Sequence, residues 1–258
     1  MSEYPIKAES AAERVARHIE ALIMEGSLRP DEPLLAEREL ATQLDVSRPT
    51  LRDGLMILKE RGLLVGARGR GMRVATLGAT AFTDPLITLF AKHPEIGDDY
   101  LEFRGVVESH AAAMAAKRAN HVDHGRIRDC LRQIDAAYEP AQEDEADIAL
   151  HLVIYEASHN KVLLQIMRAL SSNLKSDVIQ NRSHMFNIPE MREVLRNQHH
   201  AIGEAILRRD PETAQHAAHE HLAYIRQASN KIQAAQTELN LSLRRLNGGG
   251  ISLPAQKQ

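Results

Sequence analysis

The strand pattern of this chain stops early. Beyond Ala81 no stretch alternates apolar and polar residues, and amphipathic helical patterns instead follow one another to about Leu246. Amphipathic helices without strands must bury their apolar faces against one another. The chain beyond residue 81 is therefore expected to form an all-α bundle. Its expected helices cover 83–92, 98–119, 123–138, 143–157, 161–180, 189–208 and 211–240.

The segment before this bundle has a different pattern, with three helices and then two short strands. Ser47 is the expected N-cap of the third helix, which ends at Gly62. The two strands are joined by the Gly- and Arg-rich stretch "ARGRG" at 67–71. Three helices followed by a hairpin are typical of a winged helix-turn-helix. The remaining expected elements are helices over 10–25 and 36–44 and strands over 63–66 and 72–76.

These patterns predict a mainly α protein with two domains. The winged helix-turn-helix, with its small β-hairpin wing, takes residues 1–76, and a linker of 77–82 follows. The all-helical effector-binding domain covers 83–246. The last residues, 247–258, are rich in glycine and polar side chains, and we expect a disordered tail there.

The composition excludes several classes of protein. No stretch approaches the ~18 apolar residues of a membrane span, and "MSEYPIKAES" lacks the apolar core of a signal peptide. Cys130 is the only cysteine, so disulfides are not expected. Trp is absent and aromatic residues make up 3% of the chain, which leaves little material for aromatic stacking on nucleic acid or sugar. A cytoplasmic protein without a membrane partner is expected.

Basic charge is concentrated in one region. The net charge of the chain is −3, but residues 45–76 contain seven Lys or Arg against three acidic residues, a local charge of +4. A short basic region in an acidic protein indicates a local anionic partner.

Long motifs in both halves resemble one known family. The stretches "LLAERELATQLDVSRPTLRDGLMILKERGLL" and "RGRGMRV" resemble the DNA-binding domain of GntR-family transcription regulators. The helical remainder resembles the FCD effector domain of the FadR-like branch, and "LEFRGVVESHAAAMAAKRA" is most similar to the lactate-responsive and pyruvate dehydrogenase complex repressor group. Three positions depart from the usual pattern. They are Asp31, Leu35 and Gly54, the last in a helix where alanine is typical.

The resemblance implies a set of DNA-contacting residues. The second helix of a helix-turn-helix places its N-terminal residues in the major groove, where arginine can bind guanine through two hydrogen bonds. Arg48 and Arg52 are four residues apart and share a helix face, so both can reach DNA together. A solvated basic surface without a target is the alternative for any one arginine, and four arginines with a wing favour DNA. The implied residues are Arg38, Ser47, Arg48, Thr50, Arg52, Arg68, Gly69, Arg70 and Gly71.

Two polar residues stand in an apolar helix. Asp147 and His151 are four residues apart in "DIALHLVIYEASHN", so their side chains share one face. A buried carboxylate must be paired, protonated or bound to a cation. The pair alone fits either a buried Asp–His hydrogen bond or half of a metal site. Periodicity adds His199 and His221, which lie on apolar faces, whereas His200, His216 and His219 lie on polar faces.

The family resemblance selects the same residues for a metal. Members that bind metal use one Asp and three His, and this pattern falls on Asp147, His151, His199 and His221. That donor set suits a divalent transition ion, with Zn²⁺ the leading choice and Ni²⁺ or Mn²⁺ as alternatives. The resemblance also places Arg104 at the effector, where it could bind a carboxylate. The alternative for Arg104 is an intrahelical salt bridge to Glu108.

The leading functional hypothesis is a homodimeric transcription regulator that is not an enzyme. It is expected to repress genes of carboxylic-acid metabolism by binding double-stranded operator DNA. A small 2-hydroxy or 2-oxo acid, of the lactate, pyruvate, glycolate or 2-hydroxyglutarate type, is expected to release it by binding at the metal. A metal-sensing regulator and a metalloenzyme are the two alternatives.

Overall fold

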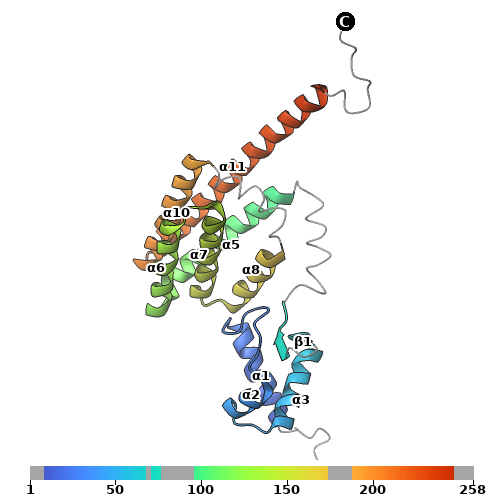
Figure 1. The fold of residues 1–258 in the computed structure, drawn as a ribbon. Coiled ribbons are helices and arrows are strands. Elements are labelled where there is room, and N and C mark those ends of the chain that lie inside the picture. The colour runs from blue at the N-terminus through green and yellow to red at the C-terminus, as the bar shows by residue number, and fades with distance from the viewer. Residues whose placement is uncertain (1–8, 68–70, 77–95, 174–187, 247–258) are drawn as a thin grey trace, which may run out of the picture. The chain divides into compact units, whose positions relative to one another are not determined.

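The computed structural model describes residues 9–67, 71–76, 96–173 and 188–246 (Figure 1). By their contacts these residues form two units. The first contains the N-terminal elements together with the helix α8 (Lys161–Asn173), and the second contains the other helices beyond residue 95. The predicted linker, the predicted helix over 83–92, the end of the one over 161–180 and the predicted tail lie outside the described residues.

The N-terminal unit has the predicted helix-turn-helix. Its helices are α1 (Ala11–Met24), α2 (Glu37–Gln43) and α3 (Arg48–Glu60). α1 begins with a reciprocal capping box between Ser10 and Glu13. At the start of α3 the Ser47 side chain accepts a hydrogen bond from the backbone N–H of Thr50, which confirms Ser47 as the N-cap.

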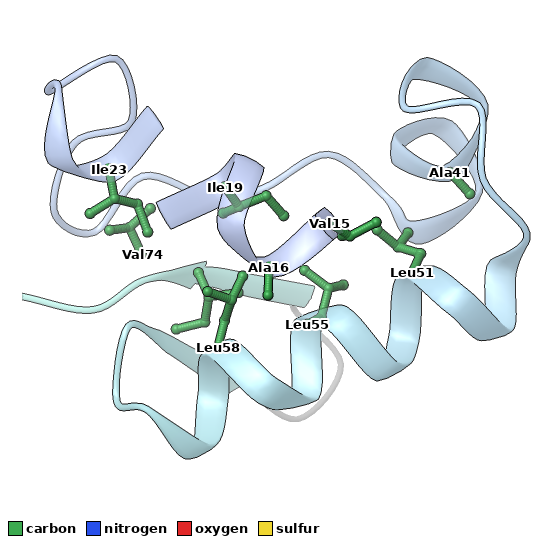
Figure 2. Close-up of a cluster of buried hydrophobic side chains, with 10 residues drawn as sticks. Val15, Ala16, Ile19, Ile23, Ala41, Leu51, Leu55, Leu58 and Val74 are labelled. Carbon is green, nitrogen blue, oxygen red and sulfur yellow. The ribbon is translucent and has the colours of Figure 1, made fainter. Parts of the chain in front are cut away.

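The wing is a two-stranded antiparallel hairpin. β1 (Leu64–Ala67) pairs with β2 (Gly71–Val74), with Leu64 opposite Val74 and Ala67 opposite Gly71. Each strand lies within one or two residues of its predicted limits. Figure 2 shows the core beneath it, where α1 and α3 meet. The core contains Val15, Ala16, Ile19, Ile23, Ala41, Leu51, Leu55, Leu58, Leu64 and Val74.

A glycine lets α1 and α3 approach closely. A Cβ atom on Gly54 would lie 2.8 Å from Cγ1 of Val15 and 2.9 Å from the backbone oxygen of Ala12. Backbone atoms cannot move aside cheaply, so alanine at this position would push the two helices apart. The glycine where the family typically has alanine therefore has a packing reason in this chain.

α8 packs with the N-terminal unit, although its place in the sequence predicted that it belongs to the effector bundle. Gln165 Nε2 donates to the backbone oxygens of Ile23 at 2.8 Å and of Met24 at 3.2 Å, at the C-terminal end of α1. These oxygens belong to the last turn of a helix, whose carbonyl groups lack partners within the helix. The periodicity of this segment predicted an amphipathic helix but could not predict which helix would cover it.

The second unit is a bundle of five described helices. They are α5 (Ile96–Arg118), α6 (His121–Ala136), α7 (Pro140–Ala157), α10 (Pro189–Leu207) and α11 (Pro211–Leu246). α5 packs along α11, α7 packs on α5 and α6, and α10 packs on α11, α6 and α5 (Figure 1). At the start of α5, Asp98 binds Arg226 and Asn230 of α11, and the hydrogen bonds from these residues lower the pKa of Asp98 to about 2.

Candidate metal centre

Four polar residues meet inside the second unit. Asp147 and His151 come from α7, His199 from α10 and His221 from α11. One ligand atom from each lies within 4.8 Å of the others, and all four side chains are buried. The structure therefore brings together, from three helices, the complete set of ligands that periodicity and the family resemblance predicted.

The distances exclude the simplest alternative for Asp147 and His151. Nε2 of His151 lies 3.7 Å from Oδ1 of Asp147, which is beyond hydrogen-bond length. The same oxygen lies 2.8 Å from Nε2 of His199. The rings of His199 and His221 are 4.5 Å apart between centroids. The carboxylate thus faces a group of imidazoles rather than a single partner on its own helix.

Neighbouring side chains orient two of the imidazoles. Nδ1 of His151 lies 2.7 Å from Oε2 of Glu108, and Nδ1 of His221 lies 3.0 Å from Oε1 of Gln198. Both oxygens are acceptors, so in a neutral imidazole each Nδ1 carries the proton and each Nε2 presents a lone pair to the cluster. Among the described residues, neither Nε2 has a hydrogen-bond partner, although both atoms are buried.

The electrostatics keep His221 neutral. Burial holds the pKa of His221 well below the usual 6.5, and the nearby His199 and His151 lower it further. A neutral imidazole with a free Nε2 lone pair is the form that binds a metal. Buried polar atoms without partners are costly unless something satisfies them. One carboxylate and three imidazoles with these orientations fit a divalent transition ion.

Glu108 on α5 connects this cluster to Arg104. Oε1 of Glu108 accepts a hydrogen bond from Nε of Arg104 at 2.5 Å, which is the intrahelical salt bridge expected as the alternative for Arg104. Burial alone would raise the pKa of Glu108, but Arg104 and His151 outweigh it and hold that pKa well below 4.5. Burial and the adjacent Glu108 raise the pKa of Tyr155 well above 10.

Glu108 and Gln198, the residues that contact Nδ1 of the histidines, were not predicted from the sequence. Glu108 had a local signal, because it stands in a stripe of buried small residues that includes Gly105, Ala111 and Ala112. A carboxylate in such a stripe needs a partner. Gln198 adjoins His199 in the chain and carries no comparable signal.

The proposed DNA-contacting residues lie on exposed parts of α2 and α3. Arg38, Ser47, Arg48 and Arg52 are exposed. Nε of Arg52 lies 2.7 Å from Oε2 of Glu37, so this arginine is tied to α2 in the absence of DNA. The Ser47 and Thr50 hydroxyl groups lie 2.8 Å apart. Gly71 opens β2 with a φ of +76°, and Arg68, Gly69 and Arg70 lie outside the described residues.

Two family models match the chain in the expected order. Residues 11–74 match the model described as "Bacterial regulatory proteins, gntR family", and residues 99–224 match the FCD domain. The Glc operon transcriptional activator of Escherichia coli is 34% identical over 245 residues, covering 89% of this chain and 96% of the relative. The chain belongs to the GntR family. It is a GntR-family regulator with an FCD domain, as the motifs predicted.

Other relatives are also transcription regulators. The lactate dehydrogenase operon regulator of Escherichia coli is 36% identical over 229 residues, covering 87% of this chain and 88% of the relative. The solved GntR structure from Streptococcus agalactiae has a TM-score of 0.52 at 23% identity, and the match covers 84% of this chain and 99% of that one. That structure supports the fold alone.

These comparisons decide between the functional classes. GntR-family proteins are DNA-binding transcription regulators, so the metalloenzyme alternative is excluded and the mainly α fold with a winged helix is confirmed. Across the described residues of this GntR-family regulator, every helix is too short or too polar to span a membrane.

Proposed function

We propose that this regulator holds a divalent transition ion at Asp147, His151, His199 and His221 and uses it to bind a small 2-hydroxy or 2-oxo acid. The supporting observation is the buried cluster itself, with donor atoms within 4.8 Å of one another and two imidazole lone pairs that lack hydrogen-bond partners among the described residues. Zn²⁺ is the proposed ion, and Ni²⁺ or Mn²⁺ fits the same donors.

The charge balance favours an anionic ligand. A divalent ion beside the Asp147 carboxylate leaves one positive charge, because Arg104 and Glu108 neutralise each other. A monoanionic acid would complete the balance. The bound ion supplies coordination positions for oxygen, and 2-hydroxy and 2-oxo acids offer two oxygens on adjacent carbons. The name of one relative, a regulatory protein of the L-lactate dehydrogenase operon, supports this chemical class.

Arg104 is the proposed second anchor for the acid. Its guanidinium group has five N–H donors, and the bond to Glu108 uses Nε. A carboxylate of the acid can therefore pair with the remaining donors, with Glu108 still holding the side chain in place. Glu108 then connects the arginine anchor to the His151 ligand.

The proposed output is repression that the acid relieves. A homodimer would present two copies of the α3 N-terminus to the half-sites of an operator, with Arg48 and Arg52 reading bases. Acid binding can weaken this complex only by its different affinities for the DNA-bound and released arrangements. The proposed wing contacts are Arg68, Gly69, Arg70 and Gly71, and Arg38, Ser47 and Thr50 complete the proposed surface.

Titration of candidate acids into a metal-saturated protein–operator complex tests the proposal. Lactate, pyruvate, glycolate and 2-hydroxyglutarate are expected to differ in potency, and the best should release the operator. Asp147→Ala is expected to remove the response but retain acid-free DNA binding, whereas His200→Ala should respond normally. Release of a metal-free complex by added metal, with no effect of any acid, would instead indicate a metal sensor. A full acid response in Asp147→Ala would overturn the metal-bound effector site.

A further inference from the structure

α11 is longer than the bundle that it helps to build. Its 36 residues end at Leu246, but Ile232 is the last residue that is even partly buried. Every residue from Gln233 to Leu246 is exposed, and Figure 1 shows this end of α11 projecting from the other helices of its unit. A helical segment of this length that packs on none of the described residues is only marginally stable in water. We therefore expect a partner to pack against the projecting end.

The projecting end continues an apolar stripe with heptad spacing. Ile225, Ile232, Leu239 and Leu246 follow at intervals of seven, and Ala228, Ala235 and Ser242 stand three residues after the first three of them. This alternation of three and four residues is the pattern of a coiled-coil seam. The start of the stripe is buried in the bundle, since Ile225 and Ala228 belong to its core. The end is exposed, with Leu239 at 52% and Leu246 at 80%.

We propose that residues 235–246 of α11 pair antiparallel with the same segment of a second copy of this chain. In that arrangement Leu239 packs against the partner's Ser242, and Leu246 packs against the partner's Ala235. Each large side chain thus meets a small one. A parallel pair would instead set leucine against leucine and serine against serine, which separates the helices unevenly along the segment.

Charge complementarity selects the same direction. Glu238 and Arg245 each precede a leucine of the stripe and lie on the same side of it. In the antiparallel register Glu238 faces the partner's Arg245, and the two-fold axis repeats this pair. The parallel register places Glu238 beside the partner's Leu243 and forms no such pair. Both charges are exposed in the single chain.

The small area of contact between the two α11 segments limits the affinity of their association. Twelve residues of helix are about 18 Å long, and such a contact buries less than the ~1,200 Å² that is typical of a stable complex. The association is therefore reversible and depends on protein concentration. It also places the two bundles at opposite ends of the paired segment.

Sedimentation velocity over a range of concentrations, with the full-length protein, tests the pairing. Glu238→Arg is expected to weaken self-association about tenfold, because two attractive pairs become repulsive. Glu238→Arg combined with Arg245→Glu is expected to restore it, since the swap recreates both pairs. Wild-type association in the single variant, or no recovery in the double variant, would overturn the proposal.

A leucine on the opposite helix face provides the matched control for the seam. Leu239→Glu is expected to abolish this association, whereas Leu241→Glu should leave it unchanged. Leu241 is 46% exposed, similar to Leu239, but it lies about 160° around the helix from it. Helix content and metal content should match wild type in both variants. Equal effects of the two substitutions would show that the stripe is not the contact.

Cross-linking determines the direction of the pair. Ala235→Cys and Leu246→Cys chains, when co-expressed, should be joined by a short bismaleimide, because these positions face each other in the antiparallel register. Neither variant alone should cross-link, since its own copy lies about 16 Å away along the axis. The native Cys130 is buried and adds little background. Cross-linking within each single variant would indicate a parallel pair, and cross-linking in none of the samples would indicate that a different segment covers α11; either result overturns the proposal.

Discussion

Glu108 lies between His151 and Arg104 and contacts both. Its Oε2 is 2.7 Å from Nδ1 of His151, and its Oε1 is 2.5 Å from Nε of Arg104. One carboxylate therefore orients a metal-ligand candidate and neutralises the proposed effector anchor. Because its pKa is held well below 4.5, the carboxylate is ionised at neutral pH.

We expect Glu108→Gln to lower metal affinity about ten- to hundredfold, the usual effect of removing the partner that orients a ligand. The amide is a weaker acceptor for Nδ1 of His151 and leaves Arg104 without its counter-charge. Competition against a coloured chelator measures the affinity. Glu102→Gln is the control, because Glu102 is on the same helix and pairs with Arg226 instead. Equal affinity in Glu108→Gln and wild type would contradict the orienting role.

Metal content should depend on the buried histidines and not on their exposed neighbour. His199→Ala and His221→Ala are each expected to lose most of the bound ion, because each removes one of four donors. His200→Ala should keep it, since His200 pairs with Asp135 at 2.8 Å, outside the cluster. Elemental analysis of the purified proteins provides the measurement. The ligand assignment is wrong if all three variants carry the same amount of metal.

The metal-free protein should lose stability as the pH falls below about 6.5. His221 stays neutral in the folded state because burial and its histidine neighbours depress its pKa, whereas in the unfolded chain it takes up a proton near 6.5. The unfolded state then binds more protons, so acid favours unfolding by up to about 1.4 kcal/mol per pH unit. Urea unfolding at pH 7.5 and 5.5 checks this. His221→Gln should reduce the difference between the two pH values, and an unchanged difference would assign the effect to another group.

Arg48→Ala and Arg52→Ala are each expected to cost at least about 1 kcal/mol in operator binding and to reduce discrimination against random duplex. The Arg52–Glu37 pair is exposed, so DNA can displace Glu37 at a cost of at most about 1 kcal/mol. Arg17→Ala, on α1, is the control for loss of a positive charge. Binding to both duplexes at constant salt is the measurement. Undiminished discrimination in both variants would remove Arg48 and Arg52 from the reading surface.

Gly54→Ala should destabilise the N-terminal unit by about 1–3 kcal/mol, although alanine is the better helix former by about 1 kcal/mol. The new Cβ would lie 2.9 Å from the Ala12 backbone oxygen. Gly125→Ala, in α6, meets nothing within 4 Å and is expected to stabilise by about 0.5–1 kcal/mol. Thermal unfolding compares the two, and stabilisation by Gly54→Ala would show that the helices can separate without cost.

The sequence alone was sufficient for the features that depend on neighbours in the chain. Helices and strands differ in period, so the winged helix and the helical bundle were both predicted, and the Ser47 cap was a local signal. The four metal-ligand candidates were also predictable. A polar residue on an apolar helix face stands out within a few turns, and His199 and His221 stood out in this way before any contact was known.

Only the tertiary structure determined which helix packs against each apolar helix face. An amphipathic helix was predicted over the segment of α8, but its position against α1 depends on residues more than 140 positions away. Glu108 and His151, which contact each other, are 43 positions apart in the chain. The atoms that a Cβ on Gly54 would approach too closely belong to a different helix, α1. Periodicity predicts that a helix face will be buried. It does not predict which element covers that face, because the free energy of burying apolar area is not directional. The partner is determined by shape, distance and hydrogen-bond geometry, which exist only after the helices have packed.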